Sequence, residues 1–323
     1  MTRRRRYVVN SNNNDPLIES TKDDDFDENV SSFLAHLKMK DRSVYTVLYY
    51  KRELRKFMTT LEEGGVATRL RRLTSDIIMD EYVMYVSEEK GARHASIAAT
   101  LRALKAFLNW AISRGIISQN PMNDVPIGKV KPKTIETFTR DQIRNLLAQP
   151  DRELFIGLRD YTIMVTLLET GIRVRELADI KMNDVRFSDN QILIRGKNGD
   201  DRLVPFQTQT RRVLRDYIKA RGQADVDYLF ITHDDKQMNR DSVRRRTIKY
   251  GRMAGIDNVR CSPHTFRHTF AKMSVKNGAD LFALQQILGH KSLDMVRVYV
   301  NLFSDEVSDA HAKFSPIEGL IRR

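Results

Sequence analysis

The stretch SPHTFRHTF, residues 262–270, decides how the last third of the chain folds. Ser262 is a strong N-cap and Pro263 suits the first helical position, so a helix is predicted to begin here. His264 and Arg267 share a face of the first turn, where unpaired N–H groups and the helix dipole favour an anion such as phosphate. Taken alone, the stretch favours a simpler interpretation, a capping histidine and a surface arginine, because helix starts attract polar residues.

A tight corner between two helices is predicted at Gly171, and Arg173 lies just past it. Glu176 follows one turn later. The pair could be a plain surface ion pair, worth ~0–1 kcal/mol. Alternatively, Glu176 holds the guanidinium rigid so that it can fork onto two phosphate oxygens. The two positions alone do not decide between these interpretations.

Residues 185–205 change to strand character, with apolar runs at 192–194 and 203–204. The sequence KNGD at 197–200 separates them, and Asn-Gly between apolar runs predicts a hairpin. Lys197 is thereby placed at its tip. Most lysines at hairpin tips are solvated, but an acid that protonates a leaving alkoxide needs the same reach.

Two further candidates lie near the C-terminal end. His290 follows Gly289, which ends an apolar helix predicted over 281–288. Tyr299 lies in a helix predicted over 292–300, where tyrosine is normally a core residue with a bonded hydroxyl. Because a phenol ionises near pH ~10, a nucleophilic Tyr299 needs help from arginines and a phosphate-bound histidine.

The candidates together comprise a phenol, two arginines, a lysine and two histidines, a set able to attack a phosphodiester without a metal. The sequence contains neither a GxxxxGK[ST] loop nor an HExxH motif nor a cysteine cluster. We therefore expect no metal and no cofactor.

Composition favours a polyanionic partner. The chain has 323 residues and a formal net charge of +13, which favours nucleic acid over a merely basic surface. Cys261 is the single cysteine, so an internal disulfide is impossible and a reducing cytoplasm fits. We expect neither a membrane span nor a secretory signal.

The length predicts two domains. Helical patterns between Phe26 and Gly115 predict an all-α domain of four helices. A second domain begins with Thr139 as N-cap and mixes helices with the hairpin. The predicted fold is thus mainly α with a small antiparallel β-sheet. Its divisions are a disordered tail at 1–25, the four-helix domain at 26–115, a linker at 116–138, the mixed α/β domain at 139–303 and a C-terminal tail at 304–323.

The polar helix faces of the first domain are rich in basic residues. They could be ordinary solvated faces, or they could clamp DNA. The candidates are Lys51, Arg52, Arg55, Lys56, Arg102 and Lys105.

The ordered set resembles the tyrosine recombinase (phage integrase) family, in particular its Xer and transposon-integrase branches. The resemblance rests on Arg173 in TGIRVREL, Lys197 in the hairpin, HTFRHTF with His264 and Arg267, LGH with His290, and Tyr299. It extends from about residue 26, since the four-helix region looks like the family's core-binding domain. A folded arm-binding domain, present in larger phage integrases, is not evident before it.

The resemblance implies roles for these residues. Tyr299 would attack the scissile phosphate and form a 3′-phosphotyrosyl link. Arg173 and Arg267 would stabilise the charge at phosphorus, and His290 would donate a hydrogen bond to a phosphate oxygen. Lys197 would be the general acid, His264 would assist proton transfer, and Glu176 would orient Arg173.

The implied function is site-specific recombination of double-stranded DNA at paired sites by a homotetramer in the cytoplasm, acting at the nucleoid. An accessory DNA-bending or directionality protein is a further implied partner. The tail around Phe314 and Ile317 could dock on a neighbouring protomer, and it favours a mobile-element integrase. The alternatives are an Xer-type resolvase of chromosome or plasmid dimers, a type IB topoisomerase and a non-catalytic DNA-binding regulator.

Overall fold

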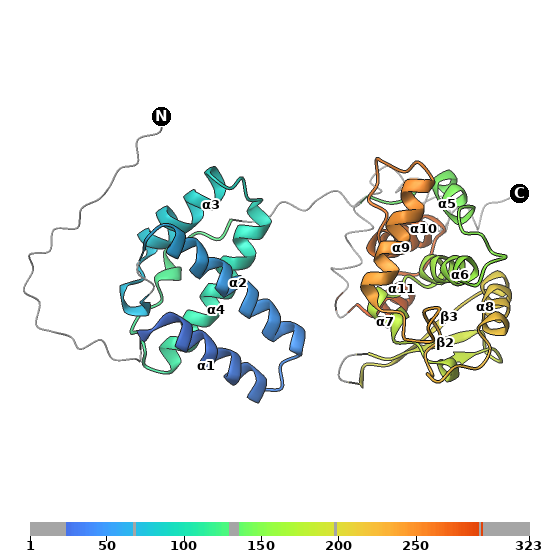
Figure 1. The fold of residues 1–323 in the computed structure, drawn as a ribbon, viewed down its shortest axis with the longest axis horizontal. Coiled ribbons are helices and arrows are strands. Elements are labelled where there is room, and N and C mark those ends of the chain that lie inside the picture. The colour runs from blue at the N-terminus through green and yellow to red at the C-terminus, as the bar shows by residue number, and fades with distance from the viewer. Residues whose placement is uncertain (1–23, 67–68, 129–135, 197–198, 291, 293–323) are drawn as a thin grey trace, which may run out of the picture. The chain divides into compact units, whose positions relative to one another are not determined.

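The computed structural model describes residues 24–66, 69–128, 136–196, 199–290 and 292. The chain divides into two units, Met1–Lys133 and Thr134–Arg323, each with its own hydrophobic core (Figure 1). No helix within the described ranges is long and apolar enough to cross a membrane.

The described part of the first unit is helical, and its first two helices begin at a side-chain cap. Asp25 accepts a hydrogen bond from the backbone N–H of Glu28, and Ser43 accepts one from Thr46. The third predicted helix winds first as a π-helix. The elements are α1 (Phe26–Met39), α2 (Val44–Glu63), a 3₁₀ turn (Leu70–Arg72), the π-helix (Ile77–Met84), α3 (Tyr85–Glu88), α4 (His94–Ser113) and a 3₁₀ turn (Pro121–Asn123).

The first unit extends beyond the predicted domain at both ends. Asp24, predicted in the disordered tail, is buried and pairs with Arg69 at 3.0 Å. Ile117, Met122 and Val125, predicted in the linker, are buried in the first core. They pack there because the chain after α4 returns across apolar side chains and removes its own apolar residues from water.

The second unit mixes helices with one three-stranded antiparallel sheet, as predicted (Figure 1). Thr139 caps its first helix in a reciprocal capping box with Gln142. Its elements are α5 (Arg140–Leu147), α6 (Phe155–Thr170), α7 (Val174–Ala178), a 3₁₀ turn (Met182–Asp184), β1 (Val185–Arg186), β2 (Gln191–Ile194), β3 (Arg202–Pro205), α8 (Thr208–Arg221), α9 (Arg240–Met253), α10 (Pro263–Lys276) and α11 (Leu281–Leu288).

The predicted hairpin is formed by β2 and β3. Ile194 pairs with Arg202 at its outer end, and Ile192 pairs with Val204 further in. The isoleucines and Val204 are buried, which fixes the face turned to the core. The connection is tight at Gly196, since a Cβ added there would lie 2.0 Å from the Asp200 carbonyl oxygen.

The single thiol lies inside this unit. Cys261 is buried just before α10, and α9 passes directly over it at Gly251. A Cβ added to that glycine would lie 2.3 Å from the Cys261 sulfur. Burial raises the pKa of the Cys261 thiol to about 11.

Candidate active site

The site is built around the corner between α6 and α7. Gly171 adopts a left-handed conformation with φ of 60°. A Cβ there would lie 2.3 Å from Cδ1 of Phe270 on α10 and 2.9 Å from Cδ2 of Leu288 on α11. Glycine is thus required twice, for the backbone conformation and for the close approach. The corner brings Arg173 next to both helices.

Glu176 holds Arg173 in two places. One carboxylate oxygen accepts the backbone N–H of Arg173 at 2.8 Å, and the other accepts from its Nη1 at 2.9 Å. The Glu176 side chain is only 12% exposed, so the pair is partly buried and is not a plain surface ion pair. Burial alone would raise the pKa of Glu176, but hydrogen bonds from Arg202 and Arg173 outweigh it and lower that pKa.

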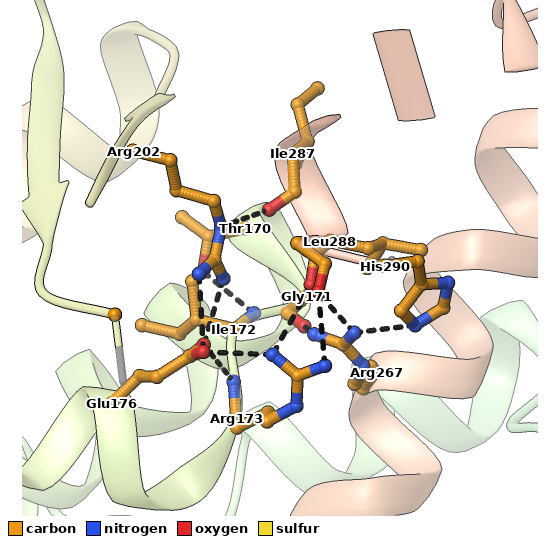
Figure 2. A network of polar contacts seen from close by, with 12 residues as sticks. Thr170, Gly171, Ile172, Arg173, Glu176, Arg202, Arg267, Ile287, Leu288 and His290 are labelled. Atoms are coloured by element: carbon orange, nitrogen blue, oxygen red, sulfur yellow. Dashed lines mark hydrogen bonds and ion pairs between the residues drawn. The ribbon is translucent and has the colours of Figure 1, made fainter. Parts of the chain in front are cut away.

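Arg267 is buried, which contradicts the simpler interpretation of a surface arginine. Its Nη1 donates to the carbonyl oxygen of Gly171 and its Nη2 to that of Leu288, both at 2.7 Å. Its Nη2 also lies 2.6 Å from Nε2 of His290 (Figure 2). A guanidinium has no acceptor atom, so Nε2 of His290 is the acceptor and the ring proton is on Nδ1.

Nδ1 of His290 is buried and has no hydrogen-bond partner among the described residues. Burial, followed by the charges of Arg267, Arg173 and Arg202, lowers the pKa of His290 to about 4. The imidazole is therefore neutral at pH 7 and has one N–H donor available. A buried donor without a partner is costly unless a ligand completes it.

His264 lies at the start of α10, next to the Ser262 cap predicted from sequence. Its side chain is accessible to solvent. Partial burial, with the charges of Arg267, Arg173 and Arg260, lowers its pKa. A neutral histidine can accept a proton, which the role assigned to His264 requires.

The C-terminal end of α11 collects arginines from three different elements (Figure 2). Arg202 from β3 donates to the Ile287 carbonyl oxygen at 2.8 Å. Arg173 donates to that of Gly289 at 3.2 Å, and Arg267 to that of Leu288. The last carbonyls of a helix lack helical partners and carry the negative end of its dipole, so they attract cations. This helix end thus assembles guanidinium groups side by side.

The sequence reading missed Arg202. Its guanidinium forks onto Glu176, with Nη1 at 3.1 Å from one oxygen and Nη2 at 2.8 Å from the other. The alternation of side chains along the strand could have indicated it. Leu203 is exposed and Val204 is buried, so Arg202 lies on the same inward face as Val204.

Two predicted site residues, Lys197 and Tyr299, lie outside the described residues. So do residues 293–300 of the helix predicted at 292–300 and the tail with Phe314 and Ile317. The structure brings Arg173, Glu176, Arg267 and His290 together. His264 is close enough that the charges of both arginines lower its pKa. In the described ranges, no three His, Cys, Asp or Glu side chains group so as to hold a metal ion.

The basic candidates of the first unit lie on α2 and α4. Lys51, Arg52, Arg55 and Arg102 are exposed. The Arg52 guanidinium is held at 2.6 Å by buried Glu53. The other two candidates, Lys56 and Lys105, are partly exposed. Nζ of Lys56 donates a hydrogen bond to the Ser96 hydroxyl at 2.8 Å.

The fold agrees with comparisons with known proteins. The Phage integrase family profile matches residues 136–306, and the profile of the phage integrase N-terminal SAM-like domain matches residues 30–115. The chain belongs to the phage integrase family. It is accordingly a tyrosine recombinase, an enzyme that cleaves and rejoins DNA strands.

Relatives and solved structures are similar over most of the chain. Tyrosine recombinase XerD of Ralstonia nicotianae is 30% identical, covering 83% of this chain and 87% of its own. XerC of Pelobacter propionicus is 29% identical, covering 90% and 95%. The Tn1549 transposon integrase, solved in complex with a circular intermediate DNA, matches with a TM-score of 0.73 at 20% identity, covering 90% of this chain and 99% of its own. XerH recombinase bound to a palindromic difH substrate matches with a TM-score of 0.70 at 17% identity, covering 88% and 85%.

Proposed function

We propose that this protein is a site-specific recombinase that cuts and rejoins double-stranded DNA through a covalent link to Tyr299. The observation that carries the proposal is the convergence at the end of α11 of Arg173, Arg267 and the Nδ1 of His290, which has no partner among the described residues. Two fixed guanidinium groups and a neutral N–H donor suit the equatorial oxygens of a phosphodiester under attack.

The reaction we propose is a transesterification in which bonds balance without a cofactor. The phenol oxygen of Tyr299 forms a bond to phosphorus while the bond to the 5′-oxygen breaks, leaving a 3′-phosphotyrosine. His264 takes the phenol proton, and Lys197 gives a proton to the leaving 5′-oxygen. Attack by a 5′-hydroxyl of another strand reverses these steps and completes the exchange.

The DNA partner is supported by the charge of the chain and by its relatives. The net charge is +13, and α2 and α4 present exposed basic side chains. The Tn1549 integrase and XerH were both solved with DNA. We propose that α2 and α4 clamp the duplex, that paired sites are joined by a tetramer, and that the enzyme acts at the nucleoid in the cytoplasm.

Two biological roles fit this chemistry. A mobile-element integrase is favoured by the tail around Phe314 and Ile317. An Xer-type resolvase of chromosome or plasmid dimers is favoured by the names of the curated relatives. The location of the cleaved sequence distinguishes them: the ends of a mobile element support the first, and a single site on a replicon supports the second.

A covalent trap tests the proposal. The purified protein is mixed with labelled fragments from the flanks of its own gene and from replicon resolution sites, then denatured in SDS, with Tyr299→Phe in parallel. We expect a protease-sensitive protein–DNA band from the wild type and none from the mutant. A band from Tyr299→Phe would mean another nucleophile. Binding without a band on any fragment would favour a regulator, and relaxation of supercoils without strand exchange would favour a topoisomerase.

A further inference from the structure

Arg202 connects three parts of the site. Its guanidinium forks onto both oxygens of Glu176, and its Nε donates to the Ile287 carbonyl oxygen (Figure 2). Its side chain is 14% exposed. β3, α7 and α11 therefore meet at one side chain.

The space for this guanidinium depends on a missing side chain. Gly289 has a φ of 63°, and a Cβ there would lie 2.9 Å from Nη1 of Arg202. The same glycine carbonyl receives Nη2 of Arg173. The two arginines thus approach the same turn after α11.

Glu176 is shared between the two arginines. Each of its carboxylate oxygens accepts one hydrogen bond from Arg202 and one from Arg173. A carboxylate with four such bonds has little freedom to rotate, so its contact with the Arg173 guanidinium is fixed in direction. Without Arg202, Glu176 would turn within its partly buried site and Arg173 would lose that direction.

We propose that Arg202 is a positioning residue for DNA cleavage, which acts through Glu176 to fix the Arg173 guanidinium against the scissile phosphate. This inference rests on the proposed function. It predicts a defect in charge placement rather than in folding or DNA binding. A misplacement of about 1 Å can cost on the order of 100-fold in rate.

The hairpin supplies a matched control. Arg195, at the end of β2, bonds buried Asp184 through Nη2 at 2.7 Å, much as Arg202 bonds Glu176. Asp184 lies in the turn before β1. Arg195→Lys therefore weakens an arginine–carboxylate pair in the same hairpin without touching Glu176, Arg173 or α11.

The kinetic test compares the rate of covalent adduct formation on two DNAs, one with the ordinary scissile phosphate and one with a methylphosphonate there. The methylphosphonate carries no charge and so needs less cationic stabilisation. We expect Arg202→Lys to slow adduct formation by roughly 10- to 100-fold on phosphate DNA and by much less on methylphosphonate DNA. Arg195→Lys should match the wild type on both. An unchanged rate, or an equal loss on both DNAs, would overturn the proposal.

A second measurement is independent of cleavage. Rotation of the Arg173 guanidinium is followed by NMR of its nitrogen-bound protons in the full chain without DNA. We expect separate, slowly averaging signals in the wild type and Arg195→Lys, and averaged signals in Arg202→Lys. Slow rotation in Arg202→Lys would contradict the positioning role. If the wild type forms no adduct with any DNA, the proposed function fails, and this measurement still decides the role of Arg202.

Discussion

The contact between Nη2 of Arg267 and Nε2 of His290, at 2.6 Å, fixes which form of the imidazole the site contains. Arg267 can only donate, so His290 accepts through Nε2 and carries its proton on Nδ1. That proton has no partner among the described residues. The contact with Arg267 thus leaves His290 with one N–H donor on Nδ1, and the imidazole itself carries no positive charge.

Lowering the pH should destabilise the protein partly through His290. Its pKa is about 4 in the folded protein and about 6.5 unfolded, so between these values the unfolded chain binds more protons. The contribution of His290 to the free energy of unfolding is fully present above about pH 6.5 and is lost as the pH drops towards 4. The loss is roughly 2 kcal/mol between pH 7.5 and 5. Urea unfolding of wild type and His290→Asn at both pH values measures this contribution.

The control for that experiment is His233→Asn. The His233 side chain is 71% exposed, so His233→Asn removes an imidazole without disturbing the buried site. His264 and His268 also have lowered pKa values and contribute in the same direction in every variant. If His290→Asn retains the full pH dependence, His290 is not held neutral by its surroundings.

Arg173 and Arg267 should differ in their effect on stability. Arg267→Ala removes donors from the carbonyls of Gly171 and Leu288 in a buried place, which should cost about 1–3 kcal/mol. Arg173 is 40% exposed, so Arg173→Ala should cost less. Both should reduce adduct formation by more than ~100-fold while DNA binding persists. Equal unfolding midpoints in urea, or near-normal cleavage by either variant, would contradict these assignments.

Gly289→Ala should impair cleavage beyond its effect on stability. Its Cβ would press on the Arg202 guanidinium, whereas a Cβ at Gly278 would meet nothing within 4 Å. Both glycines have positive φ, 63° and 81°, so both substitutions should cost about 1 kcal/mol of backbone strain. Thermal unfolding should therefore shift similarly in both. Only Gly289→Ala should slow adduct formation. Equal rates for the two variants would show that the position of the Arg202 guanidinium does not affect cleavage.

The basic face of the first unit should set the salt dependence of DNA binding. Arg52 is exposed and held by Glu53, whose other oxygen accepts from Thr100. If Arg52 neutralises one phosphate, Arg52→Ala should reduce the slope of log K against log salt by about 0.9. Lys38→Ala, an exposed lysine on α1, is the charge-matched control and should leave it unchanged. Equal slopes for both variants would remove Arg52 from the DNA-binding face.

Local signals made much of this fold predictable. The caps at Ser43, Thr139 and Ser262 begin helices as predicted, and the left-handed corner at Gly171 ends α6. These features depend on neighbours within a few residues. The spacing of His264 and Arg267 likewise placed both at the start of α10.

Contacts between distant segments were not predictable in the same way. Arg202 meets Glu176 across 26 residues and Ile287 across 85, and nothing in its own strand identifies those partners. The burial of Arg267 was hidden for the same reason, because it depends on the Gly171 corner and α11 closing around it. The prolines between residues 116 and 138 indicated a linker, but Ile117 and Met122 of this segment pack in the first core.

The buried position of Cys261 makes the native chain suitable for spectroscopy. With a thiol pKa of about 11, only roughly one molecule in a thousand or fewer carries a thiolate at pH 7.5, and α9 shields the sulfur. Maleimide dyes should therefore not label Cys261. Cysteines introduced at exposed Ser113 and Ser188, one in each unit, would carry a donor and acceptor fluorophore without any prior removal of a native thiol. Energy transfer between them would then measure the distance between the two labels, with and without DNA.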